Sequence, residues 1–160
     1  MPLEIIKRVE IIKGPAARIF GQNAFTGAIN IVTKSKESVK NNIGFQLGSF
    51  NQQHAAATLG TKLKSADLIG HASVNSSEGY RYNTDFNNQN FFVKSSFKTK
   101  ANPIDVMATF SERKFGGNQF YAIDAKEQYE KTQSSLVGVS TTLTQGALKI
   151  NPQLYWKRNQ

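Results

Sequence analysis

The sequence predicts a mainly β protein: a partial antiparallel transmembrane β-barrel that follows a small α+β segment. Three observations support this fold class. First, apolar and polar residues alternate with a period of two in a series of segments after residue 42, as in strands with one apolar face. Second, the later connections are alternately short and long, as in membrane barrels and unlike soluble β-sandwiches. Third, no apolar run reaches the roughly 18 residues of a transmembrane helix.

Residues 9–34 are predicted to form a strand, a one-turn helix, a glycine-containing loop and a second strand. Pro15 ends the first strand, because proline fixes φ and lacks a backbone N–H donor, and it suits the first position of a helix over residues 16–20. Gly27 permits a tight turn before the β-rich run at residues 28–33. The rest of the chain is expected to be arranged around this unit.

Many positions of this stretch follow one pattern: Val9, Glu10, Lys13, Gly14, Pro15, Phe20, Gly21, Ala24, Gly27, Ile29, Asn30, Ile31, Thr33 and Lys34. In this register they resemble the end of the plug domain of TonB-dependent outer-membrane receptors, whose signature reads roughly V-E-(V/I)-(L/I)-(K/R)-G-P, small residues, (Y/F)-G, and A-x-x-G-x-I-N-I-(I/V)-T-K. The departures are small: Phe20 where tyrosine is common, Arg18 where a small residue is common, and Thr26 where many members have glycine. The resemblance implies a structural role in the plug for Glu10, Lys13, Gly14, Pro15, Phe20, Gly21, Gly27 and Asn30.

The resemblance also implies a division of the chain. Residues 1–34 are expected to be the C-terminal part of the plug domain, 35–41 a polar linker and 42–160 the N-terminal strands of the barrel. The family's barrels are similar to plugged transporters of roughly 22 strands, so about seven strands form a third of the wall. The N-terminus lacks the basic and apolar regions of a signal peptide, and we expect Met1 to be a truncation point within a longer receptor.

The expected wall strands lie at residues 43–47, 55–63, 68–74, 91–97, 104–110, 137–143 and 148–156. In the third of them, Ile69 is out of phase with the apolar alternation. Short connections are expected on the periplasmic side, at residues 64–66, 99–103 and 145–146. On the outer side we expect a short first loop at 49–52 and long loops at 76–88 and 114–130.

The long outer loops hold the residues expected to contact a ligand: Tyr80, Tyr82, Phe115, Asn118, Phe120 and Tyr121. Aromatic and amide side chains can stack on a ligand and hydrogen-bond to it. The alternative is that the aromatic residues form an interfacial girdle or pack loop against loop. A stretch of the second loop, FGGN-FY followed by QYE-T, resembles receptors of the cobalamin and siderophore branch.

No catalytic or metal-binding pattern is present in the sequence. His54 and His71 are isolated, and each is expected to face the barrel lumen. The chain has no cysteine, its acidic residues do not form a spaced calcium loop, and no serine lies in a nucleophile elbow. We therefore expect neither an enzyme nor a metal or cofactor site.

The net charge of +9 raises the question of an anionic partner. Lysines at expected strand ends favour rim charges that face the head groups of outer-membrane lipid. The alternative is a soluble basic β-protein that binds single-stranded nucleic acid. Its binding residues would be Phe91, Phe92 and Phe97 among Lys94, Lys98 and Lys100.

The resemblance favours the first interpretation and implies a transport function without nucleic acid. The intact receptor would lie in the outer membrane of a Gram-negative bacterium and bind a scarce ligand such as an iron-siderophore or cobalamin. It would import this ligand when the energy-transducing TonB protein pulls on a more N-terminal plug segment by strand pairing.

Overall fold

The computed structural model describes residues 2–14, 26–99, 102–120 and 127–160, and nearly all regular structure in these ranges is β. In chain order the elements are η1 (Leu3–Ile5), β1 (Ile6–Lys13), β2 (Gly27–Thr33), η3 (Lys36–Ser38), β3 (Asn42–Gly48), β4 (Gln52–Lys62), β5 (Ala66–Ser77), β6 (Phe86–Phe97), β7 (Ile104–Gly116), β8 (Tyr129–Thr141), β9 (Leu143–Gln145), β10 (Leu148–Ile150) and β11 (Gln153–Asn159). No helical segment in the described ranges has the length and hydropathy of a membrane span. The short helix expected at residues 16–20 lies outside the described residues.

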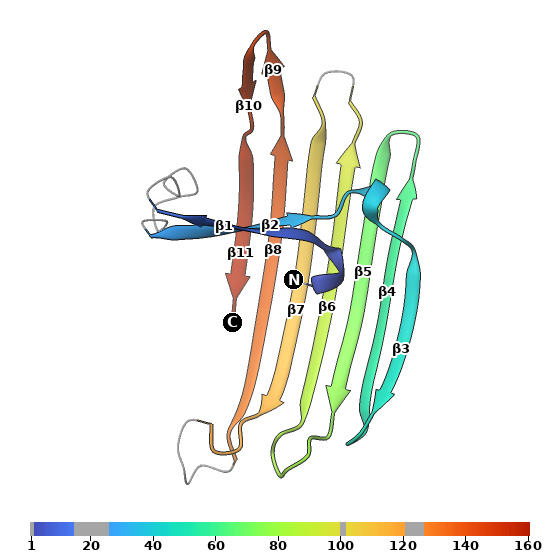
Figure 1. Cartoon of the computed structure of the whole chain (residues 1–160), viewed down its shortest axis with the longest axis vertical. Helices are drawn as coiled ribbons and strands as arrows, with labels where there is room; N and C mark the ends of the chain where they lie inside the picture. The colour runs from blue at the N-terminus through green and yellow to red at the C-terminus, as the bar shows by residue number, and fades with distance from the viewer. Residues whose placement is uncertain (1, 15–25, 100–101, 121–126) are drawn as a thin grey trace.

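Seven strands form one antiparallel sheet in the order β11-β8-β7-β6-β5-β4-β3. Figure 1 shows them side by side in a single layer, with β3 and β11 at its two edges. The expectation of a mainly β, antiparallel, seven-stranded wall is confirmed, and the sheet is open rather than closed into a barrel. We call this layer the wall sheet.

The two strands of residues 9–34 form an antiparallel hairpin, β1–β2, which we call the N-terminal hairpin. Val9 pairs with Ile31, Glu10 with Asn30 and Lys13 with Gly27, as the alternation of both runs requires. In Figure 1 the hairpin lies across the strands of the wall sheet, and η3 follows near one end of that sheet. The hairpin therefore covers one face of the wall sheet, here called the covered face.

The opposite face of the wall sheet, here called the open face, carries an apolar band. Cross-strand pairs continue this band from strand to strand, for example Ala72 with Phe91 and Phe91 with Phe110. Its large apolar side chains are exposed in the described structure, including Ile43, Phe45, Leu47, Val93, Val137, Leu154 and Trp156. A surface of this kind suits contact with lipid.

The wall strands are longer at one end than the alternation predicts. Phe86 pairs with Phe115, and Phe115 pairs with Glu130, so the ladder continues into both expected long loops. The connections shorten to residues 78–85 and 117–128. Phe115 was expected in an outer loop and instead lies in β7, because its backbone is paired on both sides. We call this end of the wall sheet the loop end, and the opposite end the turn end.

The last expected strand, residues 148–156, is wrong as a single element. Pro152 interrupts it, because proline has no N–H to donate to a ladder. The part before Pro152 is β10, which pairs with β9 as a separate hairpin at the turn end. The part after it is β11, which pairs with β8 in the wall sheet.

Candidate functional site between the N-terminal hairpin and the wall sheet

A small apolar cluster attaches the N-terminal segment to the covered face. Ile5 is only 1% exposed and packs with Val39, Ile69 and Phe92, with Met107 at the edge of the cluster. Burial of an isoleucine side chain of this size stabilises the contact by about 2 kcal/mol. Ile69 is apolar on an otherwise polar face of its strand because it packs against Ile5 of the N-terminal segment.

Polar contacts surround this cluster. The backbone N–H of Lys34 donates to the carbonyl oxygen of Ile5 at 2.8 Å, and Lys34 Nζ donates to the carbonyl oxygen of Glu4 at 2.6 Å. Lys94 Nζ on β6 donates to Thr33 Oγ1 on β2 at 3.4 Å. These bonds tie both ends of the hairpin to each other and to the wall sheet.

His71 lies buried beneath the N-terminal segment, on the covered face of the wall sheet. Its Nδ1 is 2.8 Å from Thr58 Oγ1, and its Nε2 is 3.6 Å from the Glu4 carboxylate. The described residues contain no group of His, Cys, Asp and Glu side chains that could hold a metal ion. His71 and Glu4 form a contact between the N-terminal segment and the wall sheet.

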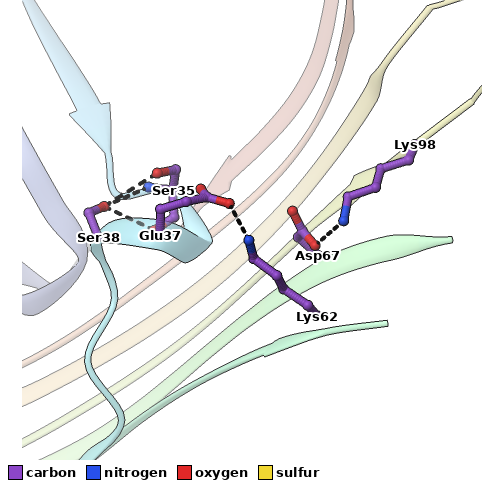
Figure 2. Close-up of polar contacts among 6 residues, drawn as sticks. All are labelled: Ser35, Glu37, Ser38, Lys62, Asp67 and Lys98. Atoms are coloured by element: carbon purple, nitrogen blue, oxygen red, sulfur yellow. Dashed lines mark hydrogen bonds and ion pairs between the residues drawn. The ribbon is translucent and has the colours of Figure 1, made fainter. Parts of the chain in front are cut away.

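The segment between β2 and β3 is held against the turn end of the wall sheet, as Figure 2 shows. The Ser38 hydroxyl accepts a hydrogen bond from the Ser35 amide at 3.0 Å and donates to the Ser35 carbonyl at 2.9 Å. The Glu37 carboxylate points away from this turn toward Lys62 Nζ, 3.1 Å away at the end of β4. Beside it, Lys98 Nζ pairs with Asp67 at 2.6 Å.

Hydrogen bonds and charge keep Glu37 ionised. A bond from its own backbone amide, followed by the Lys62 ammonium and the Ser35 hydroxyl, lowers the pKa of Glu37 to about 2. The pair with Lys62 is more than half exposed, so its net stabilisation is small. The main effect of the Glu37–Lys62 pair is to orient the segment between β2 and β3 toward the end of β4.

Close packing at Gly60 completes this attachment. The Gly60 N–H donates to Asn41 Oδ1 at 2.7 Å. A Cβ at Gly60 would lie 2.8 Å from Lys36 Cδ and 3.2 Å from Val39 Cγ1, so a larger residue there requires both side chains to shift away from β4. We call residues 35–41 the anchored segment.

The expected plug residues that the structure describes meet within the N-terminal hairpin. Asn30 Nδ2 donates to the Glu10 carboxylate at 2.7 Å, and this bond, with the Arg8 guanidinium, holds the pKa of Glu10 below its ordinary value. Gly14 has a φ of +85°, and a Cβ at Gly27 would lie 2.7 Å from the Ile12 carbonyl oxygen. Lys13 is opposite Gly27, whereas Pro15, Phe20 and Gly21 lie outside the described residues.

A polar hollow of about 430 Å³ lies on the covered face toward the loop end. Glu4, His54, Asn75, Asn88, Arg113 and Phe115 are among the residues that line it. In the described structure, His54 Nδ1 and Asn75 Oδ1 have no hydrogen-bond partner, so both can bind a polar guest. This hollow was not predicted from the sequence. The signal was the run of Asn, Ser and His at the covered positions of four strands.

The outer connections are bonded to one another at the loop end. Asn118 Nδ2 donates to the Tyr82 carbonyl oxygen at 2.8 Å, and the Asn118 amide donates to the Asn83 carbonyl oxygen at 3.0 Å. The Tyr82 hydroxyl donates to Glu127 at 3.3 Å. Tyr82 and Asn118 therefore pack loop against loop, which was the alternative considered for the aromatic residues, and ligand contact by either side chain stays a prediction.

Two other expected ligand contacts present their rings outward. Tyr80 is exposed, with the Arg81 guanidinium 5.1 Å above its ring and the Phe50 ring 6.3 Å away. Phe120 is also exposed. Tyr121, the remaining candidate, lies outside the described residues, and contact of any of them with a ligand stays a prediction.

The proposed nucleic-acid surface does not form among the described residues. Phe91 is 46% exposed on the open face, whereas Phe92 is 4% exposed on the covered face against Ile5. Lys94 is bonded to Thr33, and Lys100 lies outside the described residues. The aromatic rings are thus divided between two faces, and stacking on successive bases needs one face.

Comparison with known proteins relates segments of this chain to receptors and transporters of Gram-negative bacteria, among them outer-membrane proteins. The chain is 38% identical over 61 residues to the vitamin B12 transporter BtuB of Vibrio vulnificus, which is 38% of this chain and 10% of that one. It is 31% identical over 102 residues to the metal-pseudopaline receptor CntO of Pseudomonas aeruginosa, covering 61% and 14%. An iron-regulated outer membrane virulence protein of Vibrio cholerae is 37% identical over 57 residues, covering 35% and 8%.

These matches cover only a small part of each relative, between 8% and 14% of its length. No protein-family model matches the chain. The similarity is therefore to a segment of such receptors. The ligands in the relatives' names describe those proteins.

Proposed function

We propose that this chain is the end of the plug and the first seven wall strands of a TonB-dependent receptor in the outer membrane of a Gram-negative bacterium. One observation carries the proposal: the two faces of the wall sheet are used differently. The N-terminal segment packs on one face through Ile5, while the other face exposes a continuous apolar band. A plugged barrel needs this division, since its inside holds the plug and its outside meets lipid.

The intact receptor binds a scarce small molecule or metal chelate and imports it. The relatives support this class of ligand, because their names specify vitamin B12 and metal-pseudopaline. The ligand first meets Tyr80 and Phe120 at the loop end and then the polar hollow beside Arg113. Import needs no covalent step, only a change in how the plug contacts the wall.

The contacts between the N-terminal segment and the wall sheet that the described residues make are individually weak, and this supports a movable plug. Among the described residues, the contacts beside the Ile5 cluster include the Lys94–Thr33 hydrogen bond and the Glu4–His71 pair. Each stabilises the docked state by about 1 kcal/mol or less, which a pulling partner can overcome. TonB supplies this pull through a plug segment N-terminal to the hairpin.

A crosslinking experiment tests the proposal in the full-length receptor. The chain contains no cysteine, so Thr33→Cys with Lys94→Cys can be bridged by a short bismaleimide. We expect uptake of labelled cobalamin or ferric siderophore to require TonB and to stop after bridging. A matched pair within the hairpin, Val9→Cys with Ile31→Cys, should leave uptake unchanged, because these residues already face each other.

Two results would contradict the proposal. The first is a full-length protein that fractionates away from the outer membrane. The second is uptake that continues unchanged when Thr33 and Lys94 are bridged.

A further inference from the structure

The open face changes character abruptly at the loop end of the wall sheet. Along β7, Phe110, Glu112 and Lys114 share this face, because side chains two residues apart point the same way. Glu112 is paired with Gln133 on β8, and Lys114 with Lys131. A row of charged side chains thus follows directly on the apolar band.

Glu112 holds the two lysines of this row next to each other. Lys114 Nζ lies 2.7 Å from Glu112 Oε1, and Lys131 Nζ lies 3.3 Å from Glu112 Oε2. Gln133 Nε2 also donates to Glu112. The Glu112 side chain is only 12% exposed, whereas those of Lys114 and Lys131 are 35% and 51% exposed.

One buried carboxylate cannot neutralise two cations. Two lysines directly opposite each other on neighbouring strands repel, and the carboxylate between them offsets part of that repulsion. A net positive charge remains, and the lysines carry it on the solvent side. The pair therefore matches an anionic group that approaches the open face.

An apolar hollow lies below these lysines on the same face. Its volume is about 590 Å³, and it is lined by the small residues Ala57, Gly70, Ala72 and Ala108 and by the rings of Phe91 and Phe110. Ala108 and Lys114 are both on β7, and at the rise of a strand their separation is about 20 Å. This is about the thickness of one leaflet including its head groups.

We propose that the open face binds an anionic lipid of the outer leaflet, with its phosphate on Lys114 and Lys131 and an acyl chain in the hollow at Gly70. The inference rests on the proposed membrane location. A lipid fits both features, because one molecule carries a phosphate and an acyl chain at this separation. A free phosphate would use the lysines alone, and a soluble protein does not reach a face that lies in the membrane.

Lipid titration of the full-length receptor in detergent micelles tests the charged half of the site. Native mass spectrometry compares phosphatidylglycerol with phosphatidylcholine of the same acyl chains. We expect a preference for the anionic lipid that falls about tenfold in the Lys114→Gln/Lys131→Gln variant. The control variant, Lys64→Gln/Lys149→Gln, removes two lysines at the turn end and should keep the preference.

Gly70→Leu tests the hollow. A Cβ at Gly70 meets no atom within 4 Å, so the larger side chain enters the hollow without displacing the wall. We expect this variant to lose affinity for long-chain phosphatidylglycerol, whereas its affinity for a short-chain form is unchanged. If inorganic phosphate displaces the lipid at equal concentration, the lysines form a simple anion site and the lipid proposal is wrong.

The result also separates this inference from the proposed function. A receptor that reaches the outer membrane and imports its ligand, yet binds both lipids equally, overturns only the lipid site. A protein that does not reach the outer membrane overturns the proposed function, and the lipid site with it.

Discussion

The Lys62 ammonium lies 3.1 Å from the Glu37 carboxylate and joins the last residue of β4 to the turn that follows the N-terminal hairpin. Both side chains are more than half exposed, so the pair is a surface contact. Its position gives it importance, because the anchored segment is the covalent link between hairpin and wall sheet. Together with Gly60 and Val39, it determines where a movable hairpin would remain attached.

Acid should loosen the anchored segment between about pH 4.5 and about pH 2. The folded pKa of Glu37, about 2, is below its ordinary value of 4.5, so its contribution is complete above pH 4.5 and disappears as the pH falls through 2. Hydrogen exchange at the Val39 amide, compared with Glu37→Gln at each pH, measures this effect. We expect faster exchange in the variant at neutral pH and equal rates near pH 2. A difference that persists at pH 2 would contradict it.

Ile5→Ala should release the N-terminal segment from the wall sheet. The substitution removes the most deeply buried side chain of the cluster and leaves a cavity, which typically costs about 3 kcal/mol. Exchange of the Lys34 amide, which donates to the Ile5 carbonyl oxygen, reports this opening. Leu3→Ala is the matched control, since Leu3 is 80% exposed and should change the opening free energy by less than about 0.5 kcal/mol.

Gly60→Val should displace the anchored segment from β4. The new side chain collides with Lys36 and Val39, so the Gly60 amide should lose its bond to Asn41 and exchange faster. Gly70→Val, one strand away with open space at its Cβ, provides the comparison. Equal exchange at the anchored segment in both variants would show that close packing at Gly60 is unimportant.

Gly116→Ala should separate the outer connections. A Cβ at Gly116 would lie 2.6 Å from the Asn83 carbonyl oxygen and 2.7 Å from its carbonyl carbon, and this backbone cannot yield without breaking the bond from Asn118. Limited proteolysis of the full-length receptor should cleave residues 78–85 faster. Gly117→Ala meets only ordinary contacts, at 3.5 Å and beyond, and should be cleaved like the unmodified protein.

The alternation of side chains predicted which face each strand residue occupies. Ile69 shows that the same alternation does not predict what a residue on that face contacts. The sequence marks Ile69 as an exception to its strand, but its partner Ile5 is distant in the chain and belongs to another element. Local periodicity contains no information on such a partner. The resemblance of residues 9–34 indicated only that the N-terminal segment lies against the later strands. The residues that form the contact are known from the structure.

The polar hollow could not be predicted for a related reason. Asn75, Asn88 and Arg113 read as solvated residues, because a face turned to water and one turned to a ligand have the same polar pattern. Strand ends were also inaccurate. Phe115 lies among loop-forming glycine and asparagine residues, and pairing with Phe86 and Glu130 outweighs that local preference.

The Ile5 cluster also bears on the order of synthesis. Ile5 leaves the ribosome before Ile69 and Phe92, the residues that bury it. Until β5 and β6 exist, the Ile5 side chain has no surface to cover it. A carrier that holds the early chain unfolded would therefore have to release it only after β5 and β6 are present. Slower release would protect the N-terminal segment from aggregation.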